Sequence, residues 1–127
     1  MTTTLVQLYD HDRPTMKVGM TCLAETDRRH NPYQAVPIYE LAIYTSEDEG
    51  TYLVEWKFLD RQADHPDKDN AFGEVHHHTA IYPTLLDALI GLATFKYAAW
   101  DHRSLISRYE YEDAVGDLLY AYDPHRF

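Results

Sequence analysis

The sequence predicts an α+β domain: a mostly antiparallel β-meander of four to five strands, followed by two C-terminal helices packed on one face. Strand-like segments bounded by polar turns occupy the chain up to Tyr82, and two helical patterns follow them. A chain of 127 residues that is 45% hydrophobic has the length and composition to form one hydrophobic core. Because no internal repeat or Gly/Ser-rich linker divides the chain, we expect a single domain over residues 1–127.

The first two predicted strands form a hairpin. Thr3–Tyr9 and Lys17–Glu25 are rich in Leu, Val, Thr and Met. The segment Asp10–Pro14 between them has the composition of a turn. We therefore expect these two strands to pair antiparallel.

The clearest predicted pair is Ile38–Thr45 with Tyr52–Asp60, joined by the polar turn 46–50. In the second of these strands, one set of apolar residues alternates with a set that includes Glu55 and Lys57. This alternation is typical of a strand with one packed face and one face largely exposed to water.

A polar segment precedes the fifth predicted strand. Arg61–Gly73 carries several aspartates and is interpreted as a loop, whereas Glu74–Tyr82 has the pattern of a strand. Thr84 then stands where a helix N-cap is expected, with Asp87 three residues later. The sequence therefore predicts a helix that begins directly after Thr84.

Two helices are predicted at the end of the chain. Leu85–Trp100 is apolar on more than one face, so it needs to be covered on two sides. The second helix, at about Glu110–Tyr122, offers an apolar stripe as a cover. The stripe consists of Tyr111, Val115, Leu118 and Tyr122.

The chain is strongly acidic. Asp and Glu number 21 against 11 Lys and Arg, which gives a formal charge of −10. A field of this sign repels phosphate backbones and anionic lipids, so we expect neither direct nucleic-acid binding nor membrane binding. The first residues show no basic segment followed by an apolar run, and one cysteine cannot form an internal disulfide. Both observations favour a cytoplasmic location.

The sequence lacks the common signatures of catalysis. No GxSxG nucleophile elbow occurs, and the five glycines are too scattered to form a phosphate-binding loop. Cys22 lies in an apolar, strand-like run, which indicates a buried structural thiol. We therefore expect a protein that is not an enzyme and that carries no cofactor.

A cluster of histidines raises the hypothesis of a metal site. Three of the eight histidines are consecutive, and in a strand His76 and His78 would point to the same face. Asp10 and its neighbours His11 and Asp12 could supply a further ligand. The favoured interpretation is a solvated strand face, because neither the cysteine pairs nor the helical histidine pairs of common zinc sites occur. The candidate metal ligands are therefore His76, His78 and Asp10.

The last segment combines tyrosines with carboxylates. Aromatic residues dominate protein interfaces, and rows of carboxylates on a helix can imitate the charge of a nucleic acid. The competing interpretation is a solvated helix face with acids placed for the helix dipole. The candidate partner-binding residues are Tyr109, Glu110, Tyr111, Glu112, Asp113, Asp117 and Tyr120.

These patterns lead to three functional hypotheses. The first is a non-enzymatic binding protein that occupies a surface of a larger, basic, nucleic-acid-handling partner. Small acidic inhibitors made by phages and other mobile elements share this general character, which is an analogy of class only. The second is a structural or assembly subunit, including a homo-oligomer, in which a neighbour covers Leu85–Trp100. The third is a small metal-dependent enzyme that uses His76 and His78.

Overall fold

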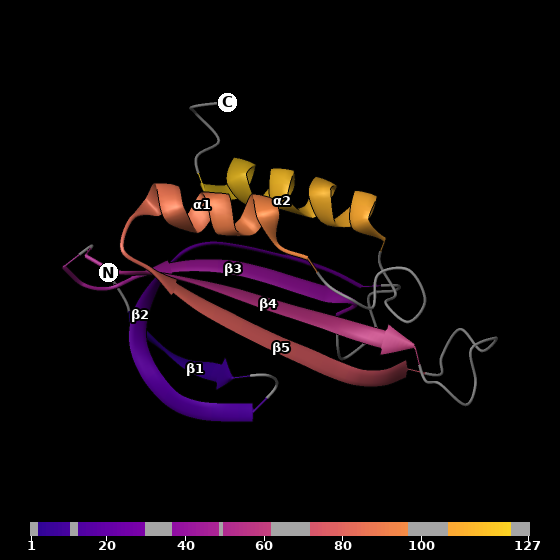
Figure 1. Ribbon diagram of the computed structural model, residues 1–127, viewed down its shortest axis with the longest axis horizontal. Helices are drawn as coiled ribbons and strands as arrows, with labels where there is room; N and C mark the ends of the chain where they lie inside the picture. Colours follow the sequence, from indigo (N-terminus) through magenta and orange to yellow (C-terminus); the bar gives the residue numbers. More distant parts are fainter. Residues whose placement is uncertain are drawn as a thin grey trace.

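The computed structural model describes residues 3–10, 13–29, 37–48, 50–61, 72–96 and 107–122. These residues form a five-stranded antiparallel sheet in the order β1-β2-β3-β4-β5, and two helices follow (Figure 1). This arrangement confirms the predicted α+β meander. The segment interpreted as a loop, Arg61–Gly73, lies mostly outside the described residues. The elements are β1 (Thr4–Asp10), β2 (Arg13–Arg28), β3 (Tyr39–Thr45), β4 (Tyr52–Arg61), β5 (Phe72–Tyr82), α1 (Leu85–Thr94) and α2 (Arg108–Tyr122).

Strand β2 is longer than the sequence predicted, and it changes partner along its length. Its first half pairs with β1, and Pro14, which was expected in the turn, lies opposite Tyr9 in this pairing. Its second half, Thr21–Arg28, pairs with β3 and contains a register shift between Cys22 and Ala24. Such irregularities bend a strand and increase its twist. The β1–β2 hairpin accordingly turns away from the helices (Figure 1).

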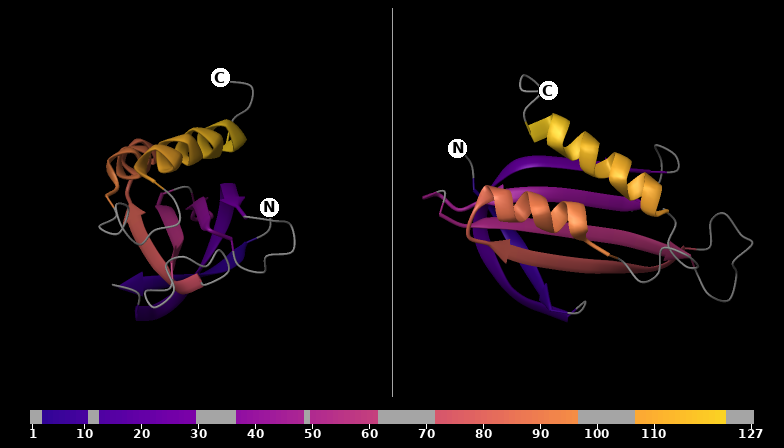
Figure 2. Two further views of the ribbon diagram at one scale, coloured as in Figure 1. Left: turned by 90° about the vertical axis from the view of Figure 1, so that its right-hand side faces the viewer. Right: turned by 45° about the horizontal axis from the view of Figure 1, so that its top comes forward.

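Both helices cover the same face of the sheet, as predicted (Figure 2). Trp56 and Phe58 of β4 stack on Phe95, which directly follows α1, with ring centroids 4.5 and 5.9 Å apart. Removal of these large apolar surfaces from water supplies the main stabilisation of the fold. The buried residues that the helices contribute are Ala88, Leu92, Tyr111, Ala114 and Leu118. Helix α1 ends at Thr94, and residues 97–100 of the predicted helix lie outside the described part.

The opposite face of the sheet is not largely exposed to water, so this expectation from the β4 alternation was wrong. The β1–β2 hairpin folds over it, and Leu53 and Glu55 are buried there. The sheet curls until β1 meets β5: the Thr79 hydroxyl accepts a hydrogen bond of 2.9 Å from the Tyr9 backbone N–H. A second, small apolar core forms under the hairpin. It consists of Val6, Met20, Ala42, Tyr44 and Leu53.

Each helix begins with a side-chain cap. Thr84 Oγ1 accepts a 3.1 Å hydrogen bond from the Asp87 backbone N–H, as predicted. Helix α2 begins at Arg108, slightly before the expected start, because Ser107 and Glu110 form a capping box. Ser107 Oγ accepts from Glu110 N at 3.2 Å, and Glu110 Oε1 accepts from Ser107 N at 3.3 Å.

Candidate functional site

The exposed side of α2 carries a tyrosine at each end and carboxylates between them. Tyr109 and Tyr120 are 78% and 60% exposed, and Glu112, Asp113 and Asp117 are exposed as well. Steps of three and four residues place these five side chains on one helical face. We call them the α2 face. Large exposed aromatic side chains are enriched in protein interfaces.

Two residues that were predicted for this surface have other roles. Tyr111 is only 2% exposed, and its hydroxyl accepts a 2.9 Å hydrogen bond from Trp56 Nε1 and donates one of 2.6 Å to the Leu92 carbonyl. Glu110 Oε2 lies 3.2 Å from Arg28 Nη1 on β2. The surface that a partner can reach therefore omits Tyr111, and Glu110 serves as a cap and an ion-pair partner. Helical spacing had already placed Tyr111 in the apolar stripe, which was the signal for its burial.

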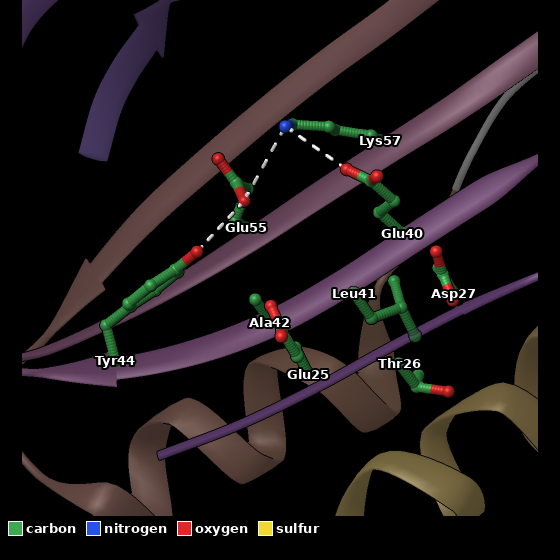
Figure 3. A pocket seen from close by; sticks show the side chains of 9 residues that line it. All are labelled: Glu25, Thr26, Asp27, Glu40, Leu41, Ala42, Tyr44, Glu55 and Lys57. Atoms are coloured by element: carbon green, nitrogen blue, oxygen red, sulfur yellow. Dashed lines mark hydrogen bonds and ion pairs between the residues drawn. The ribbon is translucent and has the colours of Figure 1, made fainter. Parts of the chain in front are cut away.

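A second candidate site lies on the sheet face opposite the helices. It is a groove of about 410 Å³ between side chains of β2, β3 and β4, which we call the β2–β4 groove (Figure 3). Its charged residues are far apart in sequence and meet through strand pairing: Asp27 lies opposite Glu40, and Glu40 lies opposite Lys57. This site could not be predicted from the sequence, because strand register is needed to find it. The lining residues are Glu25, Thr26, Asp27, Glu40, Leu41, Ala42, Tyr44, Glu55 and Lys57.

Lys57 lies between two carboxylates of the β2–β4 groove. Its Nζ is 3.2 Å from Glu40 Oε2 and 4.0 Å from Glu55 Oε1, and the Tyr44 hydroxyl donates to Glu55 Oε1 at 3.4 Å (Figure 3). Burial raises the pKa of the Glu55 carboxyl above its ordinary value, and the Lys57 ammonium offsets only part of this shift. Burial alone would lower the pKa of Lys57, but Glu55 and Glu40 together raise it. With four carboxyl groups around one ammonium, the groove suits cationic ligands rather than anions.

The histidines of β5 lie on both sides of the sheet. The His78 ring contacts Trp56 and Phe95 on the helix side, with centroids 5.3 Å from each. The His77 ring stacks on Tyr9 under the hairpin, with centroids 4.3 Å apart and an interplanar angle of 11°. These contacts give two of the three histidines packing roles.

The metal hypothesis has no support in the described ranges. Within them, no group of three His, Cys, Asp or Glu side chains is placed to hold a metal ion, so His76, His78 and Asp10 do not form such a site there. His11 and Asp12, the other possible contributors, lie outside the described residues.

Cys22 is exposed, which corrects the expectation of a buried thiol. It lies near the bend of β2, where its neighbours still desolvate the thiol and, together with the Glu25 carboxylate, raise its pKa. A raised pKa keeps the sulfur protonated at neutral pH, and a protonated thiol is a poor nucleophile. The environment of Cys22 therefore gives no support to nucleophilic catalysis.

Comparisons with protein-family models, with curated proteins and with solved structures find no match for this chain. Neither α1 nor α2, the helices of the described part, has the length and apolar character needed to cross a membrane. The basis for a functional assignment is therefore the chemistry of the α2 face and the β2–β4 groove.

Proposed function

We propose that this protein is a non-enzymatic binding protein that uses the α2 face to occupy a basic surface of a larger partner. The partner class is an enzyme that handles nucleic acid, and the consequence of binding is inhibition. The observation that carries this proposal is the pair of exposed tyrosines, Tyr109 and Tyr120, with three exposed carboxylates between them on one helical face.

The charges of the α2 face are available to a partner. Glu112 lies 3.7 Å from Arg108, whereas Asp113 and Asp117 form no ion pair with any described residue. These two carboxylates are four residues apart, which corresponds to a rise of about 6 Å along the helix. In a groove that normally holds phosphates, they would take the place of phosphate groups opposite Lys and Arg.

The two tyrosines of the α2 face supply affinity that the carboxylates alone do not. An exposed carboxylate gives long-range attraction but little affinity, since salt and water screen it. Burial of Tyr109 and Tyr120 against a partner would remove apolar ring surface from water and leave their hydroxyls free to donate hydrogen bonds. The carboxylates would thus steer the partner toward the α2 face, and the tyrosines would stabilise the complex once it has formed.

Affinity capture at two salt concentrations tests the proposal. The tagged protein is incubated with nuclease-treated lysate of its source cell at about 50 and about 500 mM NaCl, where screening differs strongly. Support would be recovery of one stoichiometric, basic, nucleic-acid-binding protein at low salt and its loss at high salt. Retention that does not depend on salt would contradict the electrostatic part, and the absence of such a partner would contradict the proposal itself.

Helix α1 favours a second candidate function, a structural or assembly subunit. Ala88 and Leu92 pack on the sheet, but Leu86 and Ile90 on the other side of the same helix are 66% and 50% exposed. A second copy of this chain could cover them. Light scattering tests this candidate: an oligomer that persists at high salt and dissociates in a Leu86→Gln/Ile90→Gln variant would support it. A strict monomer would contradict it.

A further inference from the structure

Along its second half, strand β2 has one side without a strand partner among the described residues, and we call this side the free edge. Arg13–Met20 pairs with β1, whereas Thr21–Arg28 pairs with β3 on one side only. In the part of the chain that the structure describes, no strand pairs with the other side of Thr21–Arg28. A strand edge of this kind presents a row of backbone N–H and C=O groups that can pair with another extended chain.

Carboxylates flank this edge on the side of the β2–β4 groove. Glu25 and Asp27 point into the groove from β2, and Glu40 faces it from the neighbouring strand (Figure 3). Glu25 forms no ion pair with a described residue, and the half-exposed Asp27 has its Oδ2 atom 3.6 Å from Arg29 Nη2. An extended chain beside β2 would therefore meet backbone hydrogen-bonding groups and negative charge together.

A second copy of this chain is a poor occupant for the edge. Pairing of two β2 edges would bring Glu25 and Asp27 of one copy close to the same carboxylates of the other, and like charges across strands destabilise pairing. Lysine or arginine side chains in the same positions would be stabilised instead. Charge complementarity thus selects a basic occupant.

We infer that the free edge of β2 and the adjoining β2–β4 groove bind an extended peptide segment that carries Lys or Arg at every second position. Such a segment would add to the sheet as a further strand. Side chains of an added strand alternate between the two faces, so every second one, about 7 Å from the next, lies over the groove. Their ammonium or guanidinium groups would approach Glu25, Asp27 and Glu40. This inference does not depend on the α2 face, which lies in the helix layer on the other side of the sheet.

A synthetic peptide tests strand addition directly. The probe is an acetylated, amidated eight-residue peptide in which lysine and valine alternate, and its affinity for the full chain is measured by titration calorimetry. Two further peptides carry N-methyl groups, one on every lysine amide and the other on every valine amide. Successive backbone N–H groups of a strand point to opposite edges, so only one of these two sets faces β2.

The expected result is saturable binding of the parent peptide, loss of at least about tenfold in affinity for one methylated peptide, and little loss for the other. Equal affinities for all three peptides would show purely electrostatic attachment and would overturn strand addition. Equal losses for both methylated peptides would overturn it as well. The absence of binding by the parent would mean that the carboxylates only protect the edge from pairing.

Variants of the protein locate the peptide. Glu25→Gln/Asp27→Asn should lower the affinity at least about tenfold, whereas the control Glu47→Gln/Asp87→Asn, which removes the same charge elsewhere, should leave it within about twofold. Bound peptide should also slow the alkylation of the exposed Cys22, which lies on the same edge segment. Equal affinities of the two variants, or alkylation at an unchanged rate in the complex, would place the peptide elsewhere and overturn the inference. The α2 proposal would be unaffected by that outcome.

Discussion

Trp56 and Tyr111 are joined by a hydrogen bond in the middle of the main core: the indole Nε1 donates to the tyrosine hydroxyl at 2.9 Å. The same hydroxyl donates to the carbonyl oxygen of Leu92 at 2.6 Å. Burial raises the pKa of Tyr111, so its phenol stays protonated and can donate throughout the physiological range. One buried side chain thereby connects β4, α1 and α2, and it fixes α2 so that the opposite side of the helix faces solvent.

Replacement of Tyr111 by Phe should destabilise the fold. The substitution keeps the ring but leaves the Trp56 N–H and the Leu92 carbonyl buried without their partner, at a cost of about 1 to 3 kcal/mol in the free energy of unfolding. The measurement is urea unfolding followed by tryptophan fluorescence. Tyr109→Phe on the exposed side of α2 is the control, with an expected change within about 0.5 kcal/mol. Equal stability of both variants would contradict the structural role of Tyr111.

Replacement by alanine should have opposite effects on the stability of the protein at two helical glycines. A Cβ atom at Gly91 of α1 would collide with the ring end of Tyr82, so Gly91→Ala should destabilise the protein by about 1 to 3 kcal/mol. Nothing lies within 4 Å of a Cβ at Gly116 of α2, so Gly116→Ala should stabilise it by about 0.5 to 1 kcal/mol through helix propensity. Thermal unfolding of both variants checks the signs. A stabilising Gly91→Ala would show that Tyr82 does not pack on α1.

Ionisation of Glu55 should cost stability. Burial raises the pKa of this carboxyl in the folded state above the ordinary value of 4.5, so the folded state binds the proton more tightly than the unfolded state does. The contribution of Glu55 to the free energy of unfolding therefore falls as pH rises from below 4.5 through the raised value. The stability of Glu55→Gln relative to wild type should accordingly increase with pH in this window. Urea unfolding at several pH values measures the difference, and a decrease with pH would refute the assignment.

Partner binding should weaken as the pH falls. Protonation of all eight histidines would change the formal charge from −10 to −2. Because histidine ordinarily titrates near pH 6.5, affinity for a basic partner should fade between about pH 7 and 5.5. Titration of the captured partner over this range is the measurement. An affinity that does not change with pH would show that binding does not depend on the overall charge of the protein.

The antiparallel meander and the helix cover could be predicted because their signals are local. Alternation along Tyr52–Asp60, the turn before it and the Thr84 cap each depend on a few neighbouring residues. The burial of Glu55 could not be predicted in this way. It depends on the register shift in β2, which bends the hairpin over the second face of the sheet.

The candidate sites were predictable to different degrees. The acidic, tyrosine-rich character of the α2 face follows from composition and helical spacing, and the same spacing assigns Tyr111 to the buried stripe. The β2–β4 groove was not predictable, because Glu25, Glu40 and Lys57 become neighbours only through the pairing of three strands. The local pattern predicts the β3–β4 hairpin, but the register shift in β2 decides which β2 residues lie opposite β3.

The measurement that tests the central claim most directly compares Asp113→Asn/Asp117→Asn with the control Glu47→Gln/Asp87→Asn, which removes two exposed charges outside the α2 face. Circular dichroism first establishes that both variants are folded, and the affinity of each for the captured partner is then measured at about 100 mM NaCl. We predict that the α2 variant loses at least about tenfold in affinity while the control stays within about twofold of wild type. Equal affinities of the two variants would contradict the claim that the α2 face binds the partner.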